Sequence, residues 1–137
     1  MLPVINKEIK NILSSVVPFT VELEIEDGSN SMDVFINYGD SKRIIECGSG
    51  MEKMISSIAI RVALINISSL PKSDIFIIDE GFGALDETNL EACSRLLQSL
   101  KKWFKTIMII SHVDAIKDIV DDTLEITTKE KDSYVKY

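Results

Sequence analysis

The sequence predicts an α/β fold with a parallel β-α-β core, antiparallel strands on its N-terminal side and a C-terminal hairpin. Residues 19–46 alternate between apolar and polar side chains, which is typical of half-buried strands. Two continuous apolar runs, at 75–78 and 106–110, flank a segment with helical spacing, as the strands of a parallel crossover do. Two further strand-like segments, near 124–128 and 133–136, lie on either side of a charged turn and predict the hairpin.

The N-terminal region is predicted to form an amphipathic helix over residues 3–17, followed by three short antiparallel strands. The strands are expected over 19–26, 32–38 and 42–46, because turns rich in Gly, Asp, Asn and Ser separate them. The apolar residues of the helix recur at helical spacing, with charged residues on the opposite side: Val4, Ile5, Ile9, Ile12, Leu13 and Val16.

A long and largely buried helix is predicted from about residue 50 to residue 69, because apolar residues cover most of its circumference. Pro71 stops this helix. A second helix is expected between the two apolar runs, and a short one around residues 114–120. The apolar positions that mark the two main helices are Met54, Ile55, Ile58, Ala59, Val62, Ala63 and Ile67, then Leu90, Cys93, Leu97 and Leu100.

Composition narrows the class of protein. With 137 residues and 45% hydrophobic content, the chain can bury one core, so we expect one compact domain. A formal net charge of -7 disfavours tight non-specific DNA binding by this surface alone. Cys47 and Cys93 have no C-x-x-C spacing, which indicates neither a disulfide framework nor a zinc site. No long uncharged apolar run or signal peptide is present, so we expect no membrane association and an intracellular protein, in the cytoplasm or nucleoid or in the nucleus.

Polar side chains gather where the two apolar runs end. Asp79 and Glu80 follow the first run, and His112 follows the second. In parallel sheets, ligands collect beyond the carboxyl ends of the strands. Two adjacent acids at such an end suit a site in which Asp79 holds Mg²⁺ through water and Glu80 activates the attacking water. The alternative is that the carboxylates mark the point where a buried strand emerges into solvent.

The segment from Asp79 to Asn89 reads DEGFGALDETN, and it resembles the Walker B motif and D-loop of ABC ATPases. The likeness is greatest to SbcC (Rad-fifty) exonuclease ATPases and their SMC relatives. The resemblance implies that Glu80 is the catalytic base and that Asp86 reaches across a dimer toward the opposite site. Asp86 also suits the N-cap of a helix, and we expect the two roles to coexist.

Two further motifs extend the resemblance. The end of the second apolar run, at Ser111-His112, is similar to the H-loop, which implies that His112 contacts the γ-phosphate. The segment GSGMEK, at 48–53, resembles the ABC signature at the head of a long helix, which implies nucleotide binding by Ser49, Gly50 and Glu52. Ser49 and Glu52 also form a capping box, which needs no ligand. Gly48 and Met51 depart from the usual Leu and second Gly.

The sequence contains no Walker A segment to hold the β- and γ-phosphates. The resemblance therefore implies half of an ABC-type ATPase head, the C-terminal lobe. Residues 1–18 would be the returning end of a coiled coil, and residues 19–137 the lobe. The implied ligands are ATP and Mg²⁺. The implied partners are an N-terminal P-loop lobe, a second head in a homodimer, an SbcD-type nuclease subunit and, in the full complex, double-stranded DNA.

The function implied is control of DNA access for a partner nuclease in double-strand-break repair or recombination, driven by ATP-dependent dimerisation of heads. One alternative is the head lobe of a chromosome-organising SMC protein. Another is a module that uses Ser49 and Asp86 only to dock on a P-loop ATPase. A transporter nucleotide-binding domain is disfavoured, because alternating strands precede the signature and Gly81-Phe82-Gly83 stands where transporters carry Pro-Thr-Ser. Lys53 and Arg61 lie on the helix after the signature, where they either couple nucleotide state to the head or extend to solvent.

Overall fold

A computed structural model describes residues 1–79, 81–83, 86–129 and 132–136. Along the chain, the elements are α1 (Leu2–Leu13), β1 (Thr20–Ile25), β2 (Met32–Asn37), β3 (Lys42–Ile44), the 3-10 helix η1 (Ile45–Cys47), α2 (Gly50–Ile67), β4 (Ile75–Asp79), α3 (Glu87–Leu100), β5 (Thr106–Ile110), the 3-10 helix η2 (Asp114–Asp118), β6 (Glu125–Lys129) and β7 (Asp132–Lys136).

The strands of the described residues form three separate sheets. β1, β2 and β3 make an antiparallel sheet in that order, in which Val21 lies opposite Ile36. β4 and β5 pair in parallel, with Phe76 opposite Ile107, and α3 forms the crossover between them. β6 and β7 form an antiparallel hairpin. The mixed α/β fold with a parallel pair and antiparallel sheets is the one that the sequence predicts.

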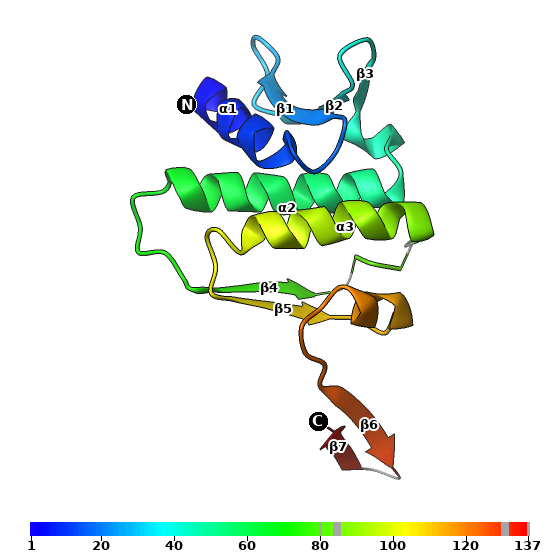
Figure 1. Ribbon diagram of the computed structural model, residues 1–137. Helices are drawn as coiled ribbons and strands as arrows, with labels where there is room; N and C mark the ends of the chain where they lie inside the picture. Colours follow the sequence, from blue (N-terminus) through cyan, green and yellow to red (C-terminus); the bar gives the residue numbers. More distant parts are fainter. Residues whose placement is uncertain (80, 84–85, 130–131, 137) are drawn as a thin grey trace.

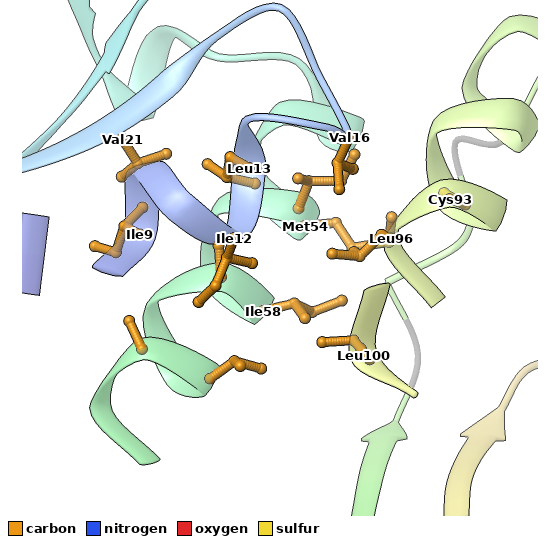
Figure 2. Close-up of a cluster of buried hydrophobic side chains, with 14 of the residues drawn as sticks. Ile9, Ile12, Leu13, Val16, Val21, Met54, Ile58, Cys93, Leu96 and Leu100 are labelled. Atoms are coloured by element: carbon orange, nitrogen blue, oxygen red, sulfur yellow. The ribbon is translucent and has the colours of Figure 1, made fainter. Parts of the chain in front are cut away.

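The elements are stacked in layers (Figure 1). The helix α1 and the β1-β2-β3 sheet lie on one side of α2 and α3, the β4-β5 pair lies on the other side, and the β6-β7 hairpin projects away. The core lies where α1, α2 and α3 meet, and Figure 2 shows Ile12, Ile58 and Leu96 converging there from the three helices. On the sheet side, Phe76 packs against Phe104 with ring centroids 4.8 Å apart. The apolar spacing of the helices therefore corresponds to their buried faces.

Three predicted bounds differ from the structure. The first helix ends at Leu13, where residues 14–17 continue as turns whose Val16 and Val17 N–H groups donate to the Leu13 carbonyl. A helical conformation is disfavoured just before Pro18, which explains the early end. The third strand stops at Ile44 because η1 follows it. The short helix after β5 is a 3-10 helix over Asp114–Asp118.

Among the described residues, no helix combines the length and the apolar character needed to cross a membrane. The helix α2 has 18 residues, but Glu52, Lys53 and Arg61 interrupt its apolar sequence.

Candidate functional site

The carboxyl ends of β4 and β5 form one edge of the parallel pair. Asp79 is the last residue of β4, and its register partner is Ile110, the last residue of β5. His112 follows two residues after Ile110, so the chain brings Asp79 and His112 to the same edge. Both residues are exposed. Glu80, the predicted base, lies outside the described residues.

The segment after Glu80 is anchored to α2. Gly81 has a φ of 102°, a left-handed conformation that glycine adopts without strain. A Cβ at this position would lie 3.3 Å from Cγ of Met54, so the backbone approaches the first turns of α2 closely. The next side chain, Phe82, is only 2% exposed and belongs to the core. These contacts fix the chain on the C-terminal side of the predicted base.

The signature segment forms the N-terminal end of α2, and Ser49 is its N-cap. The Ser49 hydroxyl accepts a hydrogen bond from the Glu52 N–H at 3.2 Å, and the Ser49 N–H donates to Oε1 of Glu52 at 3.1 Å. This confirms the predicted capping box. Ser49 and Gly50 are exposed. Because the hydroxyl acts here as acceptor, its own O–H remains available to donate to an anion that approaches the helix N-terminus.

The two departures from the usual signature have different settings. A Cβ at Gly48 would lie 2.9 Å from Cδ1 of Ile36 and 3.0 Å from the Ile45 carbonyl oxygen. Ile36 is fully buried, so its side chain has little room to yield. Packing inside this lobe therefore requires the small residue that stands in place of Leu. Met51 is partly buried against the core.

Glu52 is a buried carboxylate whose oxygens are occupied within the chain. Nη2 of Arg43 lies 2.7 Å from Oε2 and 2.8 Å from Oε1, and the Tyr38 hydroxyl donates to Oε2 at 3.2 Å. Burial raises the pKa of the Glu52 carboxyl, but hydrogen bonds from Arg43 and Ser49 outweigh it, and the pKa lies below its usual value. Burial and the nearby Glu52 charge raise the pKa of the Tyr38 phenol. Direct nucleotide binding by Glu52 stays a prediction.

Asp86 caps the N-terminus of α3. Its Oδ1 accepts a hydrogen bond from the Asn89 N–H at 2.9 Å, which confirms the predicted capping role. The Asp86 side chain is exposed. Its predicted reach across a dimer stays a prediction.

Arg61 connects α2 to β4. Its guanidinium lies 4.9 Å from the ring centroid of Phe76, and its Nη2 donates to the Ile77 carbonyl at 3.3 Å. Arg61 is exposed, so it also extends to solvent. Lys53, on the same helix, is exposed as well.

The ends of four elements share one side of the lobe. The N-terminal ends of α2 and α3 and the carboxyl ends of β4 and β5 all lie at the right in Figure 1. The predicted site residues of the described chain belong to these ends, namely Ser49 and Gly50 at α2, Asp79 at β4, Asp86 at α3 and His112 after β5. The fold therefore gathers the motifs on a single surface although up to 63 positions separate them in the sequence.

A metal site would draw on Asp79. Among the residues that the structure describes, no group of three or more His, Cys, Asp or Glu side chains could hold a metal ion. Mg²⁺ is commonly bound by only one or two protein carboxylates, together with water and substrate phosphates. An exposed carboxylate at a strand end fits that donor chemistry.

Sequence reasoning did not identify Arg43 and Tyr38 as part of this region. Both come from the antiparallel strand region, and only the folded chain brings them to Glu52. The capping box gave one signal, because a Glu near the start of a largely buried helix needs a cationic partner. The sequence did not show which of the 15 basic residues supplies it.

Comparison with known proteins gives matches to sequences and to structures. No protein-family model matches the chain. The protein R555 of Acanthamoeba polyphaga mimivirus is 32% identical over 140 residues, covering 91% of this chain and 10% of that protein. The SbcC subunit of the SbcCD nuclease of Staphylococcus saprophyticus is 33% identical over 120 residues, covering 83% of this chain and 12% of that protein. The chain thus spans about a tenth of the length of the relatives it matches.

Solved structures share the fold at low sequence identity. A chain from a study of ATP-driven dimerisation and DNA-stimulated activation of SMC ATPases has a TM-score of 0.77 at 20% identity, covering 98% of this chain and 83% of that one. An SMC head bound to the C-terminal winged-helix domain of ScpA has a TM-score of 0.73 at 20% identity, covering 98% and 42%. The SMC head domain from Thermotoga maritima has a TM-score of 0.60 at 22% identity, covering 98% and 46%.

Proposed function

The chain is a homologue of the C-terminal region of SbcC, the large component of the SbcCD nuclease, with the fold of an SMC head domain, and from this premise we propose that it is the C-terminal lobe of an ATP-hydrolysing head. Paired heads would sandwich ATP, and hydrolysis would separate them. The output would be control of DNA access for an SbcD-type nuclease subunit in double-strand-break repair or recombination.

The observation that carries the proposal is the gathering of four motifs on one side of the lobe. In this proposal, Asp79 holds Mg²⁺, Glu80 is the base for the attacking water and His112 contacts the γ-phosphate of ATP. Ser49 faces the nucleotide of a second head, and Asp86 reaches toward the same head. The ion would neutralise charge on the phosphates during transfer.

The parallel pair offers a surface for the missing P-loop lobe. One face of β4-β5 packs on the core through Phe76 and Ile78, which are 4% and 3% exposed. The other face leaves apolar side chains about half exposed, namely Ile75, Ile77, Met108 and Ile110. A two-stranded sheet with an open apolar face is typical of an interaction surface. Because relatives extend far beyond this chain, we propose that an N-terminal P-loop lobe covers this face.

Charge argues that DNA contacts come largely from elsewhere in the assembly. The net charge of -7 repels phosphate at long range, and the seven ion pairs among the described residues engage six of the lysines and arginines. We therefore assign DNA binding to the full complex of head, coiled coil and nuclease, and assign control of that binding to this lobe.

The test is reconstitution with a P-loop lobe, followed by measurement of ATP turnover. Wild-type chain is expected to give turnover, and Glu80→Gln is expected to abolish most of it because the amide cannot accept the proton of water. Glu91→Gln is the matched control, since Glu91 is exposed on α3 and pairs only with Arg95 in the described structure. Equal turnover for Glu80→Gln and wild type would exclude Glu80 as the base.

A non-catalytic docking module is the second candidate. Its supporting observation is that Ser49 and Asp86 both make complete capping interactions within the chain, without any ligand. If Glu80→Gln supports full turnover while substitutions of Ser49 and Asp86 prevent association with the P-loop lobe, this second function replaces the first.

A further inference from the structure

The buried carboxylate of Glu52 links the antiparallel sheet to the signature turn. Its side chain is 6% exposed, whereas the Arg43 side chain that faces it is 48% exposed. A buried carboxylate is costly unless hydrogen bonds and a cation compensate for the lost water. Arg43 of β3 and Tyr38, just after β2, supply these contacts. The sheet therefore holds a group that belongs to the first turn of α2.

The same carboxylate holds Ser49. Oε1 of Glu52 accepts from the Ser49 N–H at 3.1 Å and from Nη2 of Arg43 at 2.8 Å. The Glu52 N–H in turn donates to the Ser49 hydroxyl at 3.2 Å. Two hydrogen-bonded steps thus connect the guanidinium to the backbone and side chain of the serine. Loss of the guanidinium would free Glu52 to rotate, and the Ser49 N–H would lose its fixed acceptor.

A second contact runs parallel to this chain of bonds. Arg43 lies opposite Ile36 in the sheet register, and Ile36 packs under Gly48, the residue before Ser49. The guanidinium also lies 5.7 Å from the ring centroid of Tyr38, which restricts its orientation. The β2-β3 pair therefore contacts the signature turn through an ionic and an apolar connection side by side.

We infer that Arg43 and Tyr38 are positioning residues for the signature serine. Through Glu52 they set the direction in which the Ser49 hydroxyl leaves the end of α2. The inference rests on the proposed function of Ser49 as a ligand of the γ-phosphate bound to a second head. It also assigns Glu52 to the support of that serine, because hydrogen bonds inside the lobe occupy both carboxylate oxygens.

The first test measures ATP turnover by the chain reconstituted with a P-loop lobe. Arg43→Met is expected to lower kcat about tenfold, because displaced catalytic groups lose their alignment. The KM for ATP is expected to stay within about twofold, because the P-loop lobe supplies most nucleotide binding. Arg43→Lys keeps the positive charge and is expected to recover part of kcat. Lys42→Met is the matched control, since Lys42 is the adjacent residue of β3 and pairs with Glu22 and Glu24.

All variants are compared at a temperature where thermal melting shows them folded. A wild-type kcat in Arg43→Met would overturn the inference. So would an equal loss in Lys42→Met, because that result would indicate general damage to the sheet. If Arg43→Met does not fold, a wild-type kcat in Arg43→Lys combined with Tyr38→Phe would overturn it.

A second measurement separates this inference from the proposed function. Amide hydrogen exchange at Ser49 reports its bond to Glu52 in the chain alone, with no ATP and no second lobe. Arg43→Met is expected to speed this exchange about tenfold, which corresponds to loss of one hydrogen bond, and Lys42→Met is expected to leave it unchanged. Unchanged exchange in Arg43→Met would refute the positioning role. Faster exchange together with wild-type turnover in Ser49→Ala would instead refute the proposed function of Ser49.

Discussion

Asn6 of α1 makes two hydrogen bonds to the backbone of Leu23 in β1. Its side-chain Nδ2 donates to the Leu23 carbonyl at 3.0 Å, and its Oδ1 accepts from the Leu23 N–H at 2.9 Å. β1 is an edge strand of its sheet, so the amide side chain takes the place that a neighbouring strand would have. One residue thereby holds the first helix on the sheet.

Asn6→Ala is expected to lower the free energy of unfolding by about 1–3 kcal/mol, because it leaves a partly buried N–H and carbonyl without partners. Urea unfolding followed by circular dichroism measures the change. Asn11→Ala on the same helix is the matched control, since Asn11 is exposed. If the two variants are equally stable, the Asn6 bonds do not stabilise the fold.

Asp86→Ala is expected to destabilise the chain by about 1 kcal/mol, because the N–H of Asn89 loses its capping acceptor. Asp86→Asn keeps an acceptor oxygen and is expected to unfold at nearly the wild-type urea concentration. In the reconstituted head, Asp86→Asn separates capping from catalysis. Reduced turnover with unchanged stability is expected from the proposed role across the dimer, and wild-type turnover would leave Asp86 with the capping role alone.

Met108→Glu is expected to prevent co-purification with a P-loop lobe, because it places a charge in the exposed apolar face of β4-β5. The side chain is 48% exposed, so the isolated chain should remain folded. Met32→Glu is the matched control, at a β2 methionine that is 52% exposed on a different sheet. Co-purification of Met108→Glu at the wild-type level would place the partner elsewhere.

Acid is expected to weaken the contribution of Glu52 to stability. Its folded pKa lies below the ordinary 4.5, so the stabilisation is present above that pH and is lost as the pH falls through the folded pKa. The difference in unfolding free energy between wild type and Glu52→Gln should therefore be constant from about pH 7 to about pH 5 and shrink below pH 4.5.

Removing the cause should remove this pH dependence. The interaction with Arg43 contributes to the low pKa of Glu52, so the comparison is repeated in an Arg43→Met background. There the difference in unfolding free energy that Glu52→Gln produces should be smaller and should vary less below pH 4.5. The same acid dependence in both backgrounds would contradict the assigned cause.

Local periodicity was enough to predict the helices and most strands. The apolar spacing of α2 and the two apolar runs of β4 and β5 depend only on residues near in sequence, and the crossover rule then places the two strands together. The capping residues Ser49 and Asp86 were predictable for the same reason, because each bonds to a backbone N–H three positions ahead.

Contacts between distant residues were not predictable in this way. Asn6 reaches Leu23 across 17 positions, and Arg95 donates to the Val16 carbonyl across 79. Many polar residues could supply such bonds, and only the packing of the core selects one of them. The helix bound at residue 17 was wrong because Val16 is buried in a turn as well as it would be in a helix.

The complete capping box at Ser49 has a thermodynamic consequence. Since the turn is already ordered by bonds inside the chain, its conformational entropy is lost during folding of the lobe. A phosphate that docks on it meets a preorganised surface, and the free energy of that encounter is not reduced by the ordering of a loose loop.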